Sequence, residues 1–328
     1  MDLSSYEKSQ PERNASAKGR AAFAELVAAR ARYGTRRPGV RAAAFRIALM
    51  LTALGFGTGA TTGAEGSASG DPKVLRVCAD PNNLPYSNKA GEGFENRIAA
   101  ILADDLQAQL FYFWFAQHKA FLRRTLAEKR CDLVVSVPVG LKQVAITRPY
   151  FSSTYVAVTR ARDEARRFSS FDDAWLPVAH IGLQLVGNEG VMTPPAVALS
   201  ARGLNQHIHA FPMWAADDVP DPQGRILDAV ANGDIDVAFV WGPFAGFFAK
   251  AHGAQLRIDP IAGDPQNPEL NFVYPMAVGV RKDDLALRDR LQQALDRHAE
   301  EIAAVIRDYG TPTPPVTEAA TTFSPKSP

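Results

Sequence analysis

The sequence lacks the residue patterns of the common catalytic and metal centres. Its six histidines show no metal-ligand spacing, and it has neither a Gly-x-Ser-x-Gly elbow nor a glycine-rich phosphate loop. Asp217, Asp218 and Asp221 come nearest to a cation site, but prolines interrupt them and no EF-hand pattern is present. We interpret them as a solvated acidic loop. We therefore expect neither a bound metal nor a cofactor.

The chain also lacks a strong excess of either charge. Its 328 residues carry a net charge of +1. Residues 1–64 contain 10 basic and 4 acidic residues, which leaves 26 basic and 31 acidic residues in 65–328. This mildly acidic body argues against nucleic acid as a partner, because a nucleic-acid-binding face is basic. The length is sufficient for two lobes with a substantial core.

A mostly apolar run near the start is too short for a membrane span of ~20 residues. Residues Ala42–Phe56 form this run, which Arg46 interrupts. Arg36, Arg37 and Arg41 precede it and small residues follow it, and these are the parts of an export signal. We expect residues 1–64 to be an extension with an export signal. The mature chain would then lie in the periplasm without stable membrane insertion; an uncleaved anchor is the alternative.

Cysteine is scarce, with only Cys78 and Cys131 present. An oxidising periplasm would favour a disulfide between them. However, Cys78 lies near the end of one predicted strand and Cys131 just before another. If these strands are parallel neighbours, their offset of about four residues separates the cysteines by roughly 13 Å. A disulfide needs Cα atoms within about 7 Å, so we favour two separate thiols and keep the disulfide as the alternative.

Strands and helices alternate along the chain from residue 74 onwards. This alternation predicts an α/β fold with mainly parallel sheets in two lobes. Two extended crossings, 148–158 and 272–280, predict a two-segment hinge. We expect lobe 1 at residues 73–157 and 274–310, lobe 2 at 158–273 and a disordered tail at 311–328. The predicted strands are 74–79, 110–115, 132–137, 178–185, 207–211 and 237–240, and the predicted helices are 97–105, 119–128, 194–201, 224–232 and the region 284–308.

Several segments resemble one family of known proteins. They are Arg76–Pro85, Gly91–Ile98, Arg130–Asp132 and Thr147–Tyr150. Together they resemble the solute-binding-like proteins associated with quinoprotein dehydrogenases, the methanol oxidation J proteins among them, within periplasmic solute-binding protein family 3. The likeness is strongest over residues 74–160. It implies a two-lobe periplasmic binding protein fold of type II.

The resemblance also implies that this chain has lost the ligand anchors of polar amino-acid receptors. Those receptors hold the ligand's carboxylate with an arginine and its amine with an aspartate; these positions correspond to Gly140 and Trp241 here, and the stacking aromatic corresponds to Asn83. Truncating one partner of a buried charged pair costs about 2–5 kcal/mol. Lys142 lies close enough to replace the arginine in part. We therefore expect no amino-acid receptor.

The sequence predicts an apolar cleft where those anchors are missing. Trp241 and Phe244 follow a lobe 2 strand, at the carboxyl end where open α/β sheets bind ligands. An apolar concave surface is typical of a site for a hydrophobic ligand or a protein segment. The expected cleft residues are Asp80, Asn82, Asn83, Tyr86, Pro138, Val139, Lys142, Trp214, Trp241 and Phe244. For the first four, turn formation is the alternative; Phe239, Phe247 and Phe248 are interpreted as core.

The densest aromatic run, Leu110–Phe115, predicts a strand buried on both faces. If this strand instead lies at a sheet edge, Trp114 becomes a candidate docking surface.

The resemblance implies three possible functions. The leading one is a non-enzymatic, chaperone-like periplasmic protein that assists maturation or activation of a PQQ-dependent methanol or alcohol dehydrogenase. An alternative is the receptor of an ABC transporter for a small uncharged or aromatic ligand. The third is an enzyme, because some relatives of these receptors are dehydratases; Asp80 and Glu95 are the candidate acids or bases.

Overall fold

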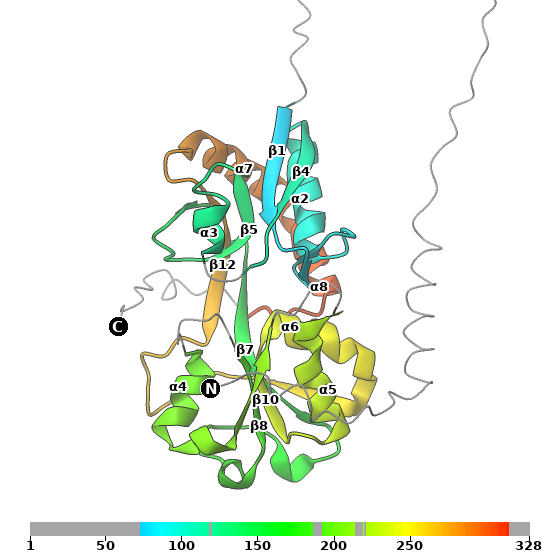
Figure 1. The fold of residues 1–328 in the computed structure, drawn as a ribbon, viewed down its shortest axis with the longest axis vertical. Helices are drawn as coiled ribbons and strands as arrows, with labels where there is room; N and C mark the ends of the chain where they lie inside the picture. The colour runs from blue at the N-terminus through cyan, green and yellow to red at the C-terminus, as the bar shows by residue number, and fades with distance from the viewer. Residues whose placement is uncertain (1–72, 118–119, 186–191, 214–218, 220, 315–328) are drawn as a thin grey trace, which may run out of the picture. The chain divides into compact units, whose positions relative to one another are not determined.

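One hydrogen-bonded path of strands runs through the molecule. The computed structural model describes residues 73–117, 120–185, 192–213, 219 and 221–314. The strands follow the order β4, β1, β5, β12, β7, β10, β8 and β9, with β6 and β11 paired to β12 and β7 (Figure 1). Their bounds are β1 Lys73–Ala79, β4 Ala108–Trp114, β5 Leu133–Pro138, β6 Ala145–Ile146, β7 Phe151–Arg160, β8 Ile181–Leu185, β9 Ile208–Pro212, β10 Val237–Trp241, β11 Leu256–Pro260 and β12 Val273–Val280.

Helices and parallel strands alternate in each half of this path. Strand β1 is parallel to β4 and β5, and β8 is parallel to β9 and β10. Strand β7 is antiparallel to both β12 and β10, so it continues from one half into the other (Figure 1). This arrangement confirms the predicted α/β class. The lobe boundaries stay a prediction. The helices are α2 Phe94–Asp105, α3 Phe121–Arg124, α4 Pro194–Ala201, α5 Arg225–Asn232, α6 Gly242–Phe248, α7 Leu285–Arg297 and α8 Ala299–Asp308.

Apolar residues at helical spacing fix the helices to the strands. In α2, Ile98 and Leu102 are fully buried against Val77 of β1 and Leu133 of β5. Helices α7 and α8 bury Leu291 and Ile302 in the same core. Phe239 of β10 lies in a second core. The interpretation of Phe239 as a core residue is therefore confirmed, and Phe247 and Phe248 are partly buried against the first core.

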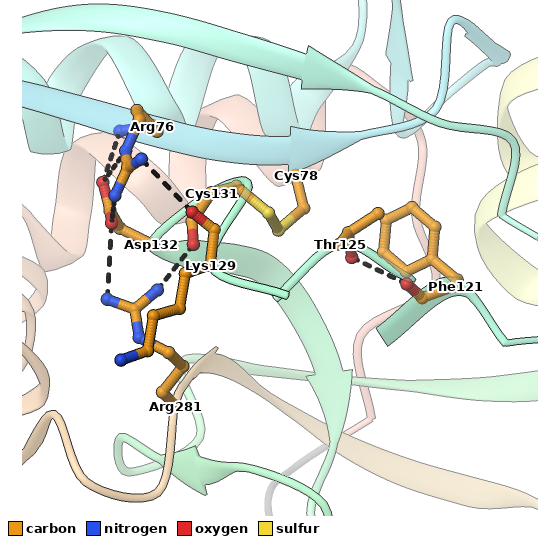
Figure 2. Close-up of a disulfide and its surroundings, with 8 residues drawn as sticks. All are labelled: Arg76, Cys78, Phe121, Thr125, Lys129, Cys131, Asp132 and Arg281. Carbon is orange, nitrogen blue, oxygen red and sulfur yellow. Dashed lines mark hydrogen bonds and ion pairs between the residues drawn. A yellow bond between two sulfur atoms is a disulfide. The ribbon is translucent and has the colours of Figure 1, made fainter. Parts of the chain in front are cut away.

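The helix predicted at residues 119–128 is wrong in its length. Only α3, Phe121–Arg124, forms, and Lys119 lies outside the described residues. Ala120 precedes α3 with a left-handed φ of 67°. At its end, the hydroxyl of Thr125 donates a hydrogen bond of 2.7 Å to the carbonyl of Phe121 (Figure 2). Local side-chain bonding of this kind competes with helix continuation.

The expectation of two separate thiols is wrong, because Cys78 and Cys131 form a disulfide (Figure 2). Their Cα atoms lie 5.4 Å apart. Strand β5 begins only at Leu133, so Cys131 belongs to the bend before it and strand spacing does not apply. Arg76 holds this bend through two hydrogen bonds to the carboxylate of Asp132, and Arg281 donates 2.6 Å to the carbonyl of Cys131.

Two further predictions are corrected at the ends of the path. Strand β4 ends the path, so the aromatic run is an edge strand; its Phe111 is 56 % exposed. The tail was expected to be disordered from Thr311, yet Thr311 is buried and Ser153 donates 2.9 Å to the carbonyl of Pro312. Residues 315–328 and the predicted export signal lie outside the described residues.

The remaining elements are short. The described part of the chain contains no helix that is both long and apolar enough to cross a membrane. The short strands are β2 Asn82–Asn83 and β3 Ser87–Asn88, and the 3-10 helices are η2 Glu164–Arg166, η3 Leu176–Val178, η4 Leu204–His207, η5 Pro222–Gly224 and η6 Ala249–Gln255.

Candidate functional site

Three of the predicted cleft residues contact one another. The indole Nε1 of Trp241 donates a hydrogen bond of 2.5 Å to the phenol oxygen of Tyr86. The ring of Phe244 lies 5.5 Å from that of Tyr86, centroid to centroid. Tyr155 and Tyr274 pack edge-on against Trp241 at 5.2 and 5.8 Å. We call Tyr86, Tyr155, Trp241, Phe244 and Tyr274 the aromatic cluster.

Trp241 is held where β10 passes into α6. It is the last residue of the strand, and its N–H donates 3.2 Å to the side-chain oxygen of Gln184 on the neighbouring β8. Gly242 follows, where an added Cβ would lie only 2.6 Å from the carbonyl oxygen of Thr154. A glycine is therefore required for this close approach to β7. Pro243 then starts α6 at a position that favours proline.

Tyr86 is held between β3 and the start of α2. The N–H of Glu95 donates 2.9 Å to the Tyr86 carbonyl. A Cβ at Gly93 would lie 2.0 Å from that same oxygen, so this turn also requires glycine. The Tyr86 side chain is 7 % exposed and packs on Phe94. Burial raises the pKa of Tyr86 well above its usual range, so it stays neutral at physiological pH.

Asn82 makes a second contact between the segment before α2 and the residues before α5. Its side-chain amide donates 3.1 Å to the carbonyl of Val219. In return, the amide of Gln223 donates 3.0 Å to the carbonyl of Asn82. Asp80 and Asn83 instead bind Gln117, which follows β4. The polar residues predicted for this wall thus build hydrogen-bonded turns as well as contacts to the opposite segment.

Two buried glutamines beside these contacts keep an unused polar atom. Gln184 is 5 % exposed, and its Nε2 has no hydrogen-bond partner. Gln223 is 3 % exposed, and its Oε1 has none. Burying a polar group without a partner costs about 1–3 kcal/mol. These atoms would therefore gain from a ligand that offers an acceptor and a donor.

Glu95 places a carboxyl group beneath the aromatic cluster. It is 7 % exposed, on α2. Burial raises the pKa of Glu95 to about 7, although hydrogen bonds from Ser136 lower it in part. The nearby carboxylate of Asp80 raises it further. In the described residues, no group of three or more His, Cys, Asp or Glu side chains is arranged to hold a metal.

The other predicted cleft residues lie apart from the aromatic cluster in the sequence of contacts. Pro138 ends β5 opposite Met276 of β12, and Val139 is buried and donates its N–H to the carbonyl of Pro275. Lys142 is exposed in the turn after β5. Trp214 lies outside the described residues, as do Asp217 and Asp218. Ligand or partner binding by the ten predicted residues stays a prediction.

Sequence reasoning missed Tyr155, Tyr274, Gln184 and Gln223. Both tyrosines lie on the predicted crossing segments, and their strands β7 and β12 are paired. Burial raises the pKa of Tyr274 to about 12. A signal was present, because two aromatic residues on paired crossing strands must lie near the hinge. The missing information was the register of the two strands, which decides the face that each side chain takes.

Comparisons with known proteins follow the same segments. The chain is 30 % identical over 259 residues to protein MoxJ of Paracoccus denitrificans, which covers 76 % of this chain and 92 % of that protein. It is 29 % identical over 271 residues to protein MoxJ of Methylorubrum extorquens AM1, covering 79 % and 88 %. No family model matches the chain.

A solved structure confirms the fold. The crystal structure of the periplasmic binding protein XoxJ from Methylobacterium extorquens AM1 aligns with a TM-score of 0.60 and 33 % sequence identity, over 74 % of this chain and all of that one. The predicted two-lobe periplasmic binding protein fold is therefore confirmed, and so is the resemblance read from the sequence. This chain belongs to the MoxJ family of proteins with the periplasmic binding protein fold.

Proposed function

We propose that this chain is a non-enzymatic periplasmic accessory protein of methanol oxidation. It assists the maturation or activation of a PQQ-dependent methanol or alcohol dehydrogenase. The relatives carry the name MoxJ, and the aligned crystal structure is that of a periplasmic binding protein. This ancestry supports a binding role in the periplasm.

The observation that carries the proposal is the occupant of the former ligand site. The family resemblance puts the amine-binding aspartate at Trp241, and the indole there bonds to Tyr86 and packs on Tyr155. Aromatic side chains of the protein itself thus take the place of a charged anchor. Separating Tyr86 from Trp241 would expose a concave aromatic surface, which suits an apolar protein segment better than a free amino acid.

A pull-down from periplasmic extract tests this proposal. The bait is residues 65–328 as wild type, Trp241→Ala or the control Trp175→Ala, whose indole packs against the second core instead. We expect wild type and Trp175→Ala to retain the dehydrogenase and Trp241→Ala to lose it. Equal recovery by all three baits would show that the aromatic cluster is not the interface. Recovery of transporter membrane components alone would contradict the accessory role.

Gln184 and Gln223 favour a second candidate, a receptor for a small uncharged ligand. Their unused buried donor and acceptor suit an amide or an alcohol rather than an ion. A ligand that binds only the folded chain raises its melting temperature. A thermal-shift panel of uncharged solutes should therefore reveal such a ligand, and Gln184→Leu should abolish the shift.

A further inference from the structure

The outer edge of β4 is a surface that the proposed function does not use. Strand β4 pairs with β1 along all seven of its residues, from Lys73↔Ala108 to Ala79↔Trp114. No other described strand pairs with it. We propose that this edge is a separate binding site that takes an extended acidic segment of a partner protein as an added β-strand. The proposal does not depend on the aromatic cluster.

The main chain of β4 presents free hydrogen-bonding groups to this edge. The N–H of Phe115 donates 2.9 Å to the carbonyl of Ala79, toward β1. Because successive residues of a strand point their main-chain groups to opposite sides, those of Leu110, Tyr112 and Trp114 point outward. The edge is roughly 23 Å long at ~3.3 Å per residue. Its sequence contains no charge, proline or glycine, the devices by which proteins usually block an edge strand.

One face of β4 joins this edge to two arginines that have no ion pair. Phe111, Phe113 and Phe115 lie on this face, since they alternate along the strand. The guanidinium of Arg130 stacks 4.7 Å from the ring of Phe113, and that of Arg124 stacks 5.0 Å from Phe115. Stacking fixes a guanidinium flat on the ring while its edge keeps N–H donors for a carboxylate. The two arginines are therefore prepared to bind acidic side chains.

The charge around these arginines is positive, although the body of the chain is acidic. Residues 120–130 and 281–283 contain six basic and two acidic side chains. Arg123, Lys129, Arg281 and Lys282 also line a pocket of ≈ 650 Å³ on the flank of α3. Such a field attracts a negatively charged partner and repels a like one. It therefore disfavours a second copy of this chain, whose cations would meet these across the paired edges.

The opposite face of β4 defines the other half of the partner segment. Tyr112 and Trp114 stack on this face, 4.7 Å apart and nearly parallel. A strand added to the edge would turn every second side chain toward these rings and the others toward Arg124 and Arg130. The expected segment thus alternates acidic and apolar residues.

Fluorescence anisotropy tests the proposal with a labelled peptide of alternating glutamate and valine, as long as β4. We expect saturable binding to residues 65–328, weakened by salt. The variant Arg124→Gln/Arg130→Gln should bind roughly tenfold more weakly, because two charge-assisted contacts are lost. The control Arg225→Gln/Arg307→Gln, on exposed positions of α5 and α8, should bind like wild type.

Two altered peptides separate charge from strand addition. A lysine–valine peptide should not bind, because its charge is reversed. A glutamate–valine peptide N-methylated at alternate residues should also fail, because it cannot donate to the edge. Equal binding of the N-methylated and unmodified peptides, or equal binding by both arginine variants, would overturn the proposal. Concentration-dependent dimerisation through β4 in sedimentation would overturn it as well, in favour of a second copy.

Discussion

Trp241 and Tyr86 join two segments that lie 155 residues apart through one hydrogen bond of 2.5 Å between the indole Nε1 and the phenol oxygen. Trp241 ends β10, whereas Tyr86 precedes α2. The bond therefore connects the two halves of the strand path at the position where related receptors bind their ligand. The opening of that position depends on this pair and its aromatic neighbours.

A double-mutant cycle should detect this bond. Tyr86→Phe and Trp241→Phe each remove one partner and keep the ring. We expect a coupling free energy of about 1 kcal/mol in urea unfolding, the usual net contribution of a hydrogen bond. The control cycle of Tyr86→Phe with Trp175→Phe should give a coupling near zero, because these residues belong to different cores. Equal coupling in both cycles would contradict the bond.

The buried carboxyl of Glu95 should make stability depend on pH. Its pKa is about 7 in the folded chain and 4.5 ordinarily. Below pH 4.5 both states carry the proton; as the pH rises toward 7, the unfolded state loses it first and is favoured. The free energy of unfolding should therefore fall by on the order of 3 kcal/mol across this range relative to Glu95→Gln. Parallel stability curves for the two proteins would refute this assignment.

The disulfide should contribute a large share of the stability. It closes a separation of 53 residues between Cys78 and Cys131. The chain-entropy relation predicts a loss of about 4 kcal/mol when both are replaced by alanine. Dithiothreitol should lower the urea midpoint of the wild type and leave that of the double variant unchanged. Two reactive thiols in the oxidised wild type, titrated under denaturing conditions, would exclude the bridge.

Gly246 is required where α6 meets the end of α8. A Cβ at this position would lie 1.9 Å from the carbonyl oxygen of Gly310. Gly246→Ala should therefore destabilise the chain by about 1–3 kcal/mol, the range typical of overpacking. Gly263→Ala is the matched control, since an added Cβ there meets nothing within 4 Å. Similar melting temperatures for the two variants would show that the helices move apart at little cost.

The alternation of strands and helices could be predicted from sequence because burial imposes it. Helix α4 begins at Pro194 and ends at Ala201, as the sequence indicated, because proline favours the first turn. The short α3 could not be predicted in this way. Its end depends on Thr125 and on the disulfide-linked bend at Cys131, which are tertiary features.

The candidate site was predictable only in part. Trp241 follows a strand at the carboxyl end of a sheet, and this position alone identifies it as a site residue. Its contact with Tyr86 depends on how two distant segments meet, which no local pattern records. Similarly, the aromatic run of β4 indicates a strand, but only the sheet order shows that it lies at an edge.

The most direct test of the proposed function measures the dehydrogenase itself. In a strain without this gene, periplasmic dehydrogenase is purified and its PQQ content and specific activity are determined, with complementation by wild type, Trp241→Ala or Trp175→Ala. We predict low activity per enzyme in the deletion strain, recovery with wild type and Trp175→Ala, and little recovery with Trp241→Ala at equal abundance. Full PQQ loading and normal activity in the deletion strain would contradict the account.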